Sequence, residues 1–354
     1  MNLGVYCETL SPARLSDPAV LGLLGDYAVT LGHALCFQEA DRFAPARVMP
    51  HLELAAKLRT AGGRYALWPL LPKERGYWIN ERNLDAADRM IDALLDTFRR
   101  QGERPDLLVI DVETPWSQME RVFFPGPSTC RRLISFARFA LENRNPRRFA
   151  WAVGRLREIV ERVRREGIPI SSAVFPLLIA DLVDDGRALQ DYLEMPVFDV
   201  GFDAYNAMFY NSYLPQAVPL LIPPEAAPRF LFEYASELRR RFADQAWITL
   251  GSTWEGVLPG NEGKVYRAAA QLAPDIAATK AAGVKTIWLY CLEGVLFSDE
   301  KLAVRRTRAE AEAFFRTIVD TPASEPSADA HWSRNRSILE RLLRDRLNFL
   351  YGLT

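Results

Sequence analysis

Eight short apolar segments, separated mostly by helical sequence, predict a (β/α)8 TIM barrel with an added C-terminal helix. Three observations favour this fold over a doubly wound sheet, which is the main alternative. The strand-like segments number eight, the chain has 354 residues, and strand-like sequence returns near residue 290. The barrel is expected to occupy residues 1–320.

The predicted strands are apolar runs, and the predicted helices carry apolar residues at helical spacing. Strands are expected at 3–8, 26–37, 65–71, 106–111, 168–178, 198–205, 246–251 and 284–291. Helices are expected at 48–61, 83–102, 180–192, 225–242, 265–282 and 301–318. Gly62 and Gly63 end the first of these helices, and Pro274 is expected to break or restart the fifth. The second is amphipathic, with Leu84 and Ile91 on one face.

A long excursion and a tail are added to this alternation. Residues 116–167 separate the fourth and fifth strands and are expected to hold two helices, near 128–143 and 147–166. Residues 321–332 have the composition of a linker. The segment 333–354 then predicts a helix with leucines on one side, which packs on the barrel or forms a homodimer contact.

The overall composition gives no sign of a nucleic-acid or membrane partner. The formal net charge is -1, and no apolar run approaches the length of a membrane span. Cys7, Cys36, Cys130 and Cys291 form no C-x-x-C pair, and the chain begins directly with a strand. These features predict reduced cysteines and a cytoplasmic location. The three histidines argue against a His-rich zinc site and a Ser-His-Asp triad, and no cofactor is expected.

The fourth predicted strand ends in two acids. Residues 107–110 form a continuous apolar run, which is typical of a parallel strand covered on both faces. Asp111 and Glu113 follow two positions apart, so on an extended chain their side chains point to the same side. Two carboxylates at a buried strand end are costly unless they are paired or functional. They are therefore the first candidates for catalysis.

The other predicted strand ends contribute acids and aromatic residues to the same end of the barrel, where barrel enzymes form their active sites. The remaining catalytic candidates are Tyr205 and Glu255, and the substrate-binding candidates are Glu8, Trp68, Trp116, Asp203, Asn206, Trp254, Trp288, Tyr290 and Glu293. Aromatic faces stack on sugar rings, and carboxylates bond hydroxyls or move protons, so this end suits a carbohydrate. A phosphate substrate is disfavoured, because no Gly-rich phosphate loop is found and this end is rich in acids.

The fourth strand resembles the D-x-x-D-x-D-x-E signature of the chitinase-like family 18 glycoside hydrolases. Asp106, Asp111 and Glu113 match its first, third and fourth places, and Val109 stands at the second. Tyr205 could match a tyrosine at the end of strand six in that family, and Trp288 a tryptophan on strand eight, offset by one residue.

The resemblance implies that Glu113 protonates the leaving oxygen and that Asp111 orients a substrate acetamido group, which attacks the anomeric carbon. Tyr205 would then bond the same group. The acid that is missing at Val109 would alter the pKa of Asp111 and reduce or abolish turnover.

Three alternatives remain open. A glycosidase that needs no acetamido group would use Glu113 as acid/base and Glu255 as nucleophile, with an outcome set by their separation. A non-catalytic carbohydrate-binding barrel is suggested by Val109. A metal-dependent lyase, isomerase or hydrolase would hold a hard cation between Glu8, Glu293 and the acids of the fourth strand. The leading hypothesis is a glycoside hydrolase that acts on an oligosaccharide or glycoconjugate.

Overall fold

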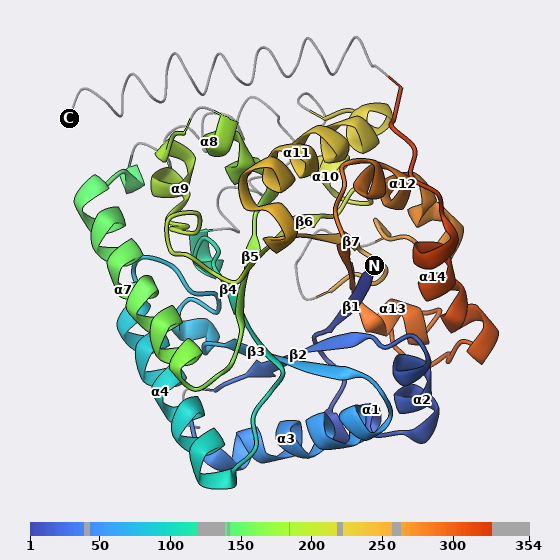
Figure 1. Ribbon diagram of the computed structural model, residues 1–354, viewed down its shortest axis with the longest axis horizontal. Helices are drawn as coiled ribbons and strands as arrows, with labels where there is room; N and C mark the ends of the chain where they lie inside the picture. Colours follow the sequence, from blue (N-terminus) through green and yellow to red (C-terminus); the bar gives the residue numbers. More distant parts are fainter. Residues whose placement is uncertain are drawn as a thin grey trace.

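The computed structural model is a closed barrel of eight parallel strands, which pair in sequence order from β1 around to β8 and back to β1 (Figure 1). This confirms the predicted (β/α)8 fold and excludes an open doubly wound sheet. The strands are β1 Asn2–Cys7, β2 Thr30–Cys36, β3 Arg64–Leu70, β4 Leu107–Asp111, β5 Ile170–Val174, β6 Ala204–Phe209, β7 Ala246–Gly251 and β8 Thr286–Tyr290. The structure describes residues 1–38, 43–118, 139, 142–183, 185–217, 222–256 and 263–327.

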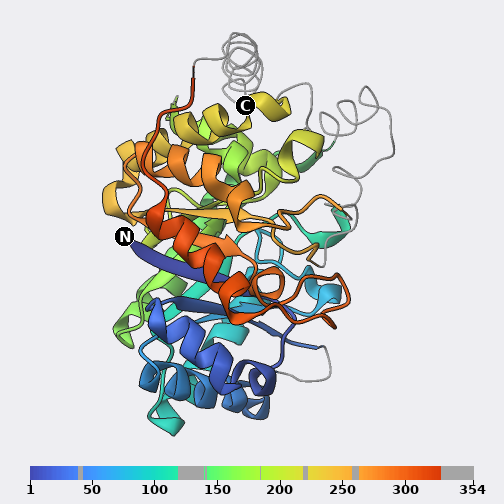
Figure 2. The same ribbon diagram turned by 90° about the vertical axis from the view of Figure 1, so that its right-hand side faces the viewer.

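Helices cover the outside of this barrel (Figure 2). Those described are α1 Pro12–Leu15, α2 Pro18–Asp26, α3 Pro45–Thr60, α4 Leu84–Gln101, α7 Pro146–Arg165, α8 Ile179–Val183, α9 Ala188–Leu193, α10 Leu214–Ala217, α11 Ala227–Phe242, α12 Ala273–Ala281, α13 Leu292–Leu296 and α14 Arg308–Asp320. The amphipathic helix expected at 83–102 is confirmed as α4, which buries Leu84, Ile91 and Phe98 and ends at Gly102 with a left-handed φ of 66°.

Several predicted boundaries are wrong. The strand expected at 198–205 lies at Ala204–Phe209, so its carboxyl end is four residues later than expected. The helix expected at 180–192 is two short helices, α8 and α9, and the one expected at 301–318 begins only at Arg308. Helices α1 and α2 were not anticipated. Most of 128–143, Cys130 and the helix expected at 333–354 lie outside the described residues, so the homodimer contact stays a prediction.

Aromatic rings fill the middle of the barrel. Trp288 is 1% exposed and packs on Tyr6, with ring centroids 4.7 Å apart. A Cβ atom added to Gly4 would lie 2.1 Å from the Trp288 ring, so the close approach of this strand to the ring requires glycine. Since Gly4 and Trp288 are neighbours in the β1–β8 register, both face the barrel axis. The interior is a packed core, and chemistry has to take place at its ends.

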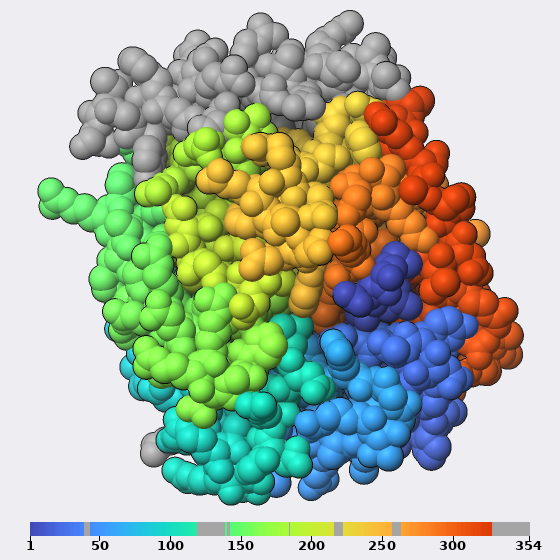
Figure 3. All heavy atoms as spheres, viewed as in Figure 1, coloured from blue at the N-terminus to red at the C-terminus, as the bar shows by residue number. Residues whose placement is uncertain are grey.

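The amino ends of the strands form the face seen in Figures 1 and 3, and that face is filled by side chains around the start of the chain, in dark blue. In Figure 2, turned by 90°, β1 runs from the N-terminus at the left toward the right, so the carboxyl ends of the parallel strands lie toward the right. The acids of β4 belong to that second end.

Candidate active site

Asp111 and Glu113 lie side by side at the carboxyl end of β4. The strand continues past Asp111 because Ile79 pairs with Val112: the Ile79 amide donates to the Asp111 carbonyl at 2.9 Å, and the Glu113 amide donates to the Ile79 carbonyl at 3.0 Å. The extended backbone places both carboxyl groups on the inner side. Asp111 is 2% exposed and Glu113 is 7% exposed.

Burial raises the pKa of both acids. It raises the pKa of Asp111 to about 7, while contacts with Glu113 and Trp68 lower it. Burial first, and then the charge of Asp111, raise the pKa of Glu113 well above its ordinary value. The two groups interact directly, so they titrate as a pair. The higher pKa of Glu113 favours the shared proton on Glu113, where it can be donated.

Glu8 is the third acid at this end of the barrel. It follows β1, is 8% exposed, and accepts hydrogen bonds from the Tyr77 hydroxyl at 3.2 Å and from the Tyr290 hydroxyl. Burial raises its pKa to about 7, although both tyrosines lower it. The charge of Glu8 in turn raises the pKa of Glu113 and so helps to keep Glu113 protonated.

Glu293 lies behind Glu8 and is fully buried. Its Oε1 atom accepts the Glu8 amide at 2.8 Å, the Thr9 amide at 2.6 Å and the Thr9 hydroxyl at 3.0 Å. A carboxylate with three short donors holds the turn in one conformation. Glu293 therefore positions Glu8 through its Oε1 atom, while its Oε2 atom is buried with no hydrogen-bond partner among the described residues.

A chain of polar side chains lies below the acids. The Thr249 hydroxyl donates to Asn206 Oδ1 at 2.7 Å, and Asn206 Nδ2 donates to the Tyr6 hydroxyl at 2.9 Å. Burial, followed by the charge of Asp111, raises the pKa of Tyr6. Asn206 thus lies in the middle of β6 instead of at its end, and it forms part of the barrel interior.

Aromatic side chains surround the acids. Trp116 lies 5.2 Å from Trp78 and 5.6 Å from Tyr77 between ring centroids, and the Lys73 ammonium lies 4.7 Å above the Trp116 ring. Trp68 packs edge-on against Tyr6 at 5.3 Å. Trp68 Nε1 and Asp111 Oδ1 are both buried, and the contact with Trp68 lowers the pKa of Asp111, so this indole lies against the acid pair.

Tyr210 was missed by the sequence analysis. It follows β6 directly and stacks on Tyr290 with centroids 5.1 Å apart. Burial raises its pKa, and the charges of Glu113 and Asp111 raise it further. Its signal in the sequence was the apolar stretch 207–209, which continues the strand beyond Asn206.

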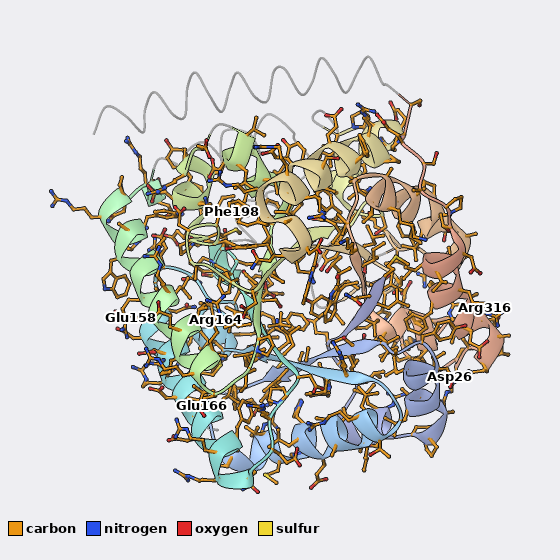
Figure 4. All side chains as sticks on the ribbon, viewed as in Figure 1. Asp26, Glu158, Arg164, Glu166, Phe198 and Arg316 are labelled. Carbon is orange, nitrogen blue, oxygen red and sulfur yellow. The ribbon has the colours of Figure 1, made fainter. Side chains whose placement is uncertain are left out.

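Two expected site residues on β6 lie elsewhere. Asp203 precedes β6, accepts the Ile170 amide at 2.9 Å and pairs with Arg164 at 2.7 Å, on the amino-end face where Figure 4 labels Arg164. Tyr205 points outward to the helices: its ring stacks on Phe242 at 3.9 Å, and its hydroxyl donates to the carbonyl of Phe198, also labelled in Figure 4, at 3.4 Å. The expectation that they line the site is wrong, because β6 is displaced along the sequence.

Two further candidates lie at the outer rim. Glu255 accepts the Gly263 amide at 2.7 Å and lies 3.7 Å from Arg267. The Trp254 indole donates to the Glu300 carbonyl at 3.1 Å. These contacts hold both residues in the loop after β7. The acids at Glu8, Asp111 and Glu113 are the ones that the structure brings together.

Within the residues that the structure describes, no three His, Cys, Asp or Glu side chains are arranged to hold a metal ion. The metal-dependent hypothesis therefore has no ligand group to support it there. Over the same residues, no helix is both long enough and apolar enough to span a membrane.

The fold and the strand-end acids define a (β/α)8 barrel with a candidate active site at the carboxyl ends of its strands. No family model and no curated protein sequence matches the chain. Solved structures do: the PgaB (BpsB) glycoside hydrolase domain from Bordetella bronchiseptica is 11% identical, with a TM-score of 0.51 over 83% of this chain and 95% of that one. A β-glucosidase from Exiguobacterium marinum is 13% identical, with a TM-score of 0.52 over 92% and 98%.

A GH5 xyloglucanase from Bacteroides ovatus, solved with a XXXG heptasaccharide, is 12% identical, with a TM-score of 0.50 over 90% of this chain and 75% of that one. These similar structures are glycoside hydrolases with the same barrel. At such low identity the likeness establishes the fold.

Proposed function

We propose that this protein is a glycoside hydrolase that cleaves an oligosaccharide or glycoconjugate, with Glu113 as the general acid. The observation that carries the proposal is the pair of buried acids on β4, whose surroundings leave the proton on Glu113 and ionise Asp111 first. A protonated carboxyl group beside an ionised one is the arrangement that glycoside hydrolysis requires. The shared barrel of the solved glycoside hydrolases adds support.

The first mechanism uses a substrate acetamido group. Glu113 gives its proton to the glycosidic oxygen as the bond from that oxygen to the anomeric carbon breaks. The acetamido carbonyl oxygen attacks the anomeric carbon, and Asp111 accepts a hydrogen bond from the acetamido N–H and balances its positive charge. Water then attacks the anomeric carbon and returns its proton to Glu113. Tyr210 lies near Asp111 and Glu113, and Tyr205 does not, so Tyr210 takes the role of hydrogen-bonding the acetamido group.

A second candidate function is carbohydrate binding without turnover. Val109 is fully buried. In the β4–β5 register Val109 pairs with Ser171 and Asp111 pairs with Ala173, so Val109 lies two positions before Asp111 on the same face of the strand. Val109 therefore faces inward below Asp111, where the family 18 signature has an acid. Asp111 then has Glu113 as its nearest proton-sharing partner, and the pair could serve only to bond sugar hydroxyls.

The expected cytoplasmic location also stays a prediction.

Glu113→Gln separates the two functions, because glutamine keeps the shape and loses the proton to be donated. With 4-nitrophenyl glycosides and chito- and gluco-oligosaccharides as probes, we expect kcat to fall about 10²–10⁴-fold while sugar binding is kept. Glu255→Gln is the matched variant, and a loss as large as that of Glu113→Gln would support the alternative in which Glu113 and Glu255 act together without an acetamido group. Sugar binding with no turnover in the unaltered protein would establish the binding barrel.

A further inference from the structure

A pocket lies outside the barrel, where α10, α11 and α12 begin. Figure 1 labels these helices near β6 and β7. It has a volume of about 180 Å³. Asn211, Tyr266 and Asp275 contribute polar groups to its lining, together with four prolines. Asn211 directly follows Tyr210, so the pocket and the candidate active site share the carboxyl end of β6.

A buried carboxylate and a buried amide form its polar side. Asp275 is 2% exposed and accepts Asn211 Nδ2 at 2.7 Å and the Tyr266 hydroxyl at 2.8 Å. Asn211 is 7% exposed and also donates to the Ala227 carbonyl at 3.4 Å. Its Oδ1 atom has no hydrogen-bond partner within the described ranges. An unpaired acceptor that is this deeply buried is costly unless a ligand donates to it.

The pocket lining selects for donors and against anions. None of its lining residues is Lys, Arg or His, whereas Asn211 Oδ1, the Asp275 oxygens and the Tyr266 hydroxyl oxygen are all acceptors. Gln271, exposed at the mouth, offers an amide. A hydroxyl group can both donate to these acceptors and accept from the Gln271 amide, but a carboxylate could not donate.

The remaining walls are apolar and fit one ring. The prolines and the Tyr266 ring provide C–H and aromatic faces; the prolines are Pro215, Pro224, Pro228 and Pro274. A cavity of roughly 150 Å³ holds a benzene ring, so the space here accommodates one hydroxylated six-membered ring. We infer that this pocket is a second sugar-binding site, which takes a single uncharged pyranose ring. The inference goes beyond the proposed hydrolysis and does not depend on Glu113.

Ligand-observed NMR titrations of the full chain with glucose, glucuronate and glycerol test the inference. We expect glucose to bind with a Kd on the order of millimolar, and glucuronate and glycerol to bind at least about tenfold more weakly. Gln271→Trp closes the mouth and should weaken the glucose component at least about tenfold. Gln101→Trp, at the exposed end of α4, is the matched control and should leave it unchanged.

Two further variants keep the test independent of folding and of the active site. Gln271→Trp removes the hydrogen bond from the Ala268 amide to Gln271 Oε1, so its thermal melt is measured to check that the protein still folds. Asp275→Asn keeps the shape of the side chain and should reduce the preference for glucose over glucuronate. Glu113→Gln should leave the pocket component intact even if hydrolysis is lost. Glucose binding that survives Gln271→Trp but changes in Glu113→Gln would place the sugar at the barrel mouth and overturn the inference, as would equal binding of glycerol.

Discussion

Two groups of buried acids lie on different loops of the barrel, and they differ in their partners. Glu8, Asp111 and Glu113 interact with one another and with tyrosine hydroxyls. Glu81 and Glu194, whose side chains are fully buried, instead pair with arginines. In this second group Arg148 reaches Glu81 at 2.7 Å and Glu194 at 2.7 Å, and Arg82 reaches Glu194 at 2.6 Å.

The difference in partners separates a structural group, Glu81 and Glu194, from the candidate catalytic group. Burial raises the pKa in both groups, to about 8 for Glu81 and to about 7 for Glu8, so the partners make the difference. Arginines hold Glu81 and Glu194 in place, whereas neighbouring acids and tyrosines surround Glu8, Asp111 and Glu113. The arginine-paired group is close to the site. Glu81 lies two residues from Ile79, which pairs with Val112 just after β4. The Thr114 hydroxyl donates at 2.8 Å to the carbonyl of Leu193, the residue before Glu194. The arginine-paired group thus holds the loops that present the catalytic candidates.

Arg148→Met should have the largest effect on stability. Removing Arg148 leaves the buried Glu81 carboxylate without its arginine and leaves Glu194 with Arg82 alone, which costs about 3–5 kcal/mol of the free energy of unfolding. Urea denaturation at pH 7 measures the change. Arg157→Met, an exposed position of the same helix α7, is the control and should cost much less. Equal losses in the two variants would remove the contrast between the groups.

Glu8→Gln should act in the opposite direction. The folded state raises the pKa of Glu8 from 4.5 to about 7, so the folded protein binds this proton more tightly than the unfolded chain does. Stability from this group is therefore highest at acid pH and is lost as pH rises toward 7. At pH 8 the substitution should raise the free energy of unfolding by on the order of 2–3 kcal/mol, and the gain should shrink at pH 5. Glu53→Gln, at an exposed position, should change it little at either pH.

The sequence predicts the acids of β4 and the barrel well, because a covered parallel strand is a continuous apolar run that ends visibly at Asp111. It fails at β6 for a physical reason. Asn206 was read as a strand end, but the barrel interior satisfies its amide through Tyr6 and Thr249, so the strand continues through a polar residue. Those partners are 200 and 43 positions away in the chain. No local pattern contains them, so a polar Asn206 looks like a strand end even though the apolar residues 207–209 continue the strand to Tyr210.

The hydrogen-bond partners of the loop acids could not be predicted from the sequence either. Glu255 and Glu293 both follow strands, and in sequence they are equivalent candidates. One accepts the Gly263 amide in its own loop, and the other accepts amides after β1 from across the β8–β1 junction. The direction that a loop takes depends on tertiary packing, so the distinction appears only in the folded chain.

The pH dependence of turnover sharpens the comparison further. The mechanism needs an ionised Asp111, whose pKa is raised to about 7 by burial, and a protonated Glu113, whose pKa is raised further. We expect kcat/KM to fall about tenfold per pH unit below about 7 and to fall again at a higher pH, in the bell shape of a coupled pair. Glu113→Gln should remove the upper limb from any residual activity. A flat profile between pH 5 and 8 would contradict the assignment.

The smallest effect is expected at an exposed ion pair, which completes the series of charge environments. Asp26, labelled on the outer surface in Figure 4, lies 2.6 Å from Arg308, and the two side chains are 69% and 38% exposed. Water and salt screen such a pair, and Asp26 also ends α2, where the helix dipole disfavours a negative charge. The two effects oppose each other, so Asp26→Asn should change the free energy of unfolding by less than about 0.5 kcal/mol. Urea denaturation at low and high salt measures it, and a loss comparable to that of Arg148→Met would show that exposure does not separate these charges.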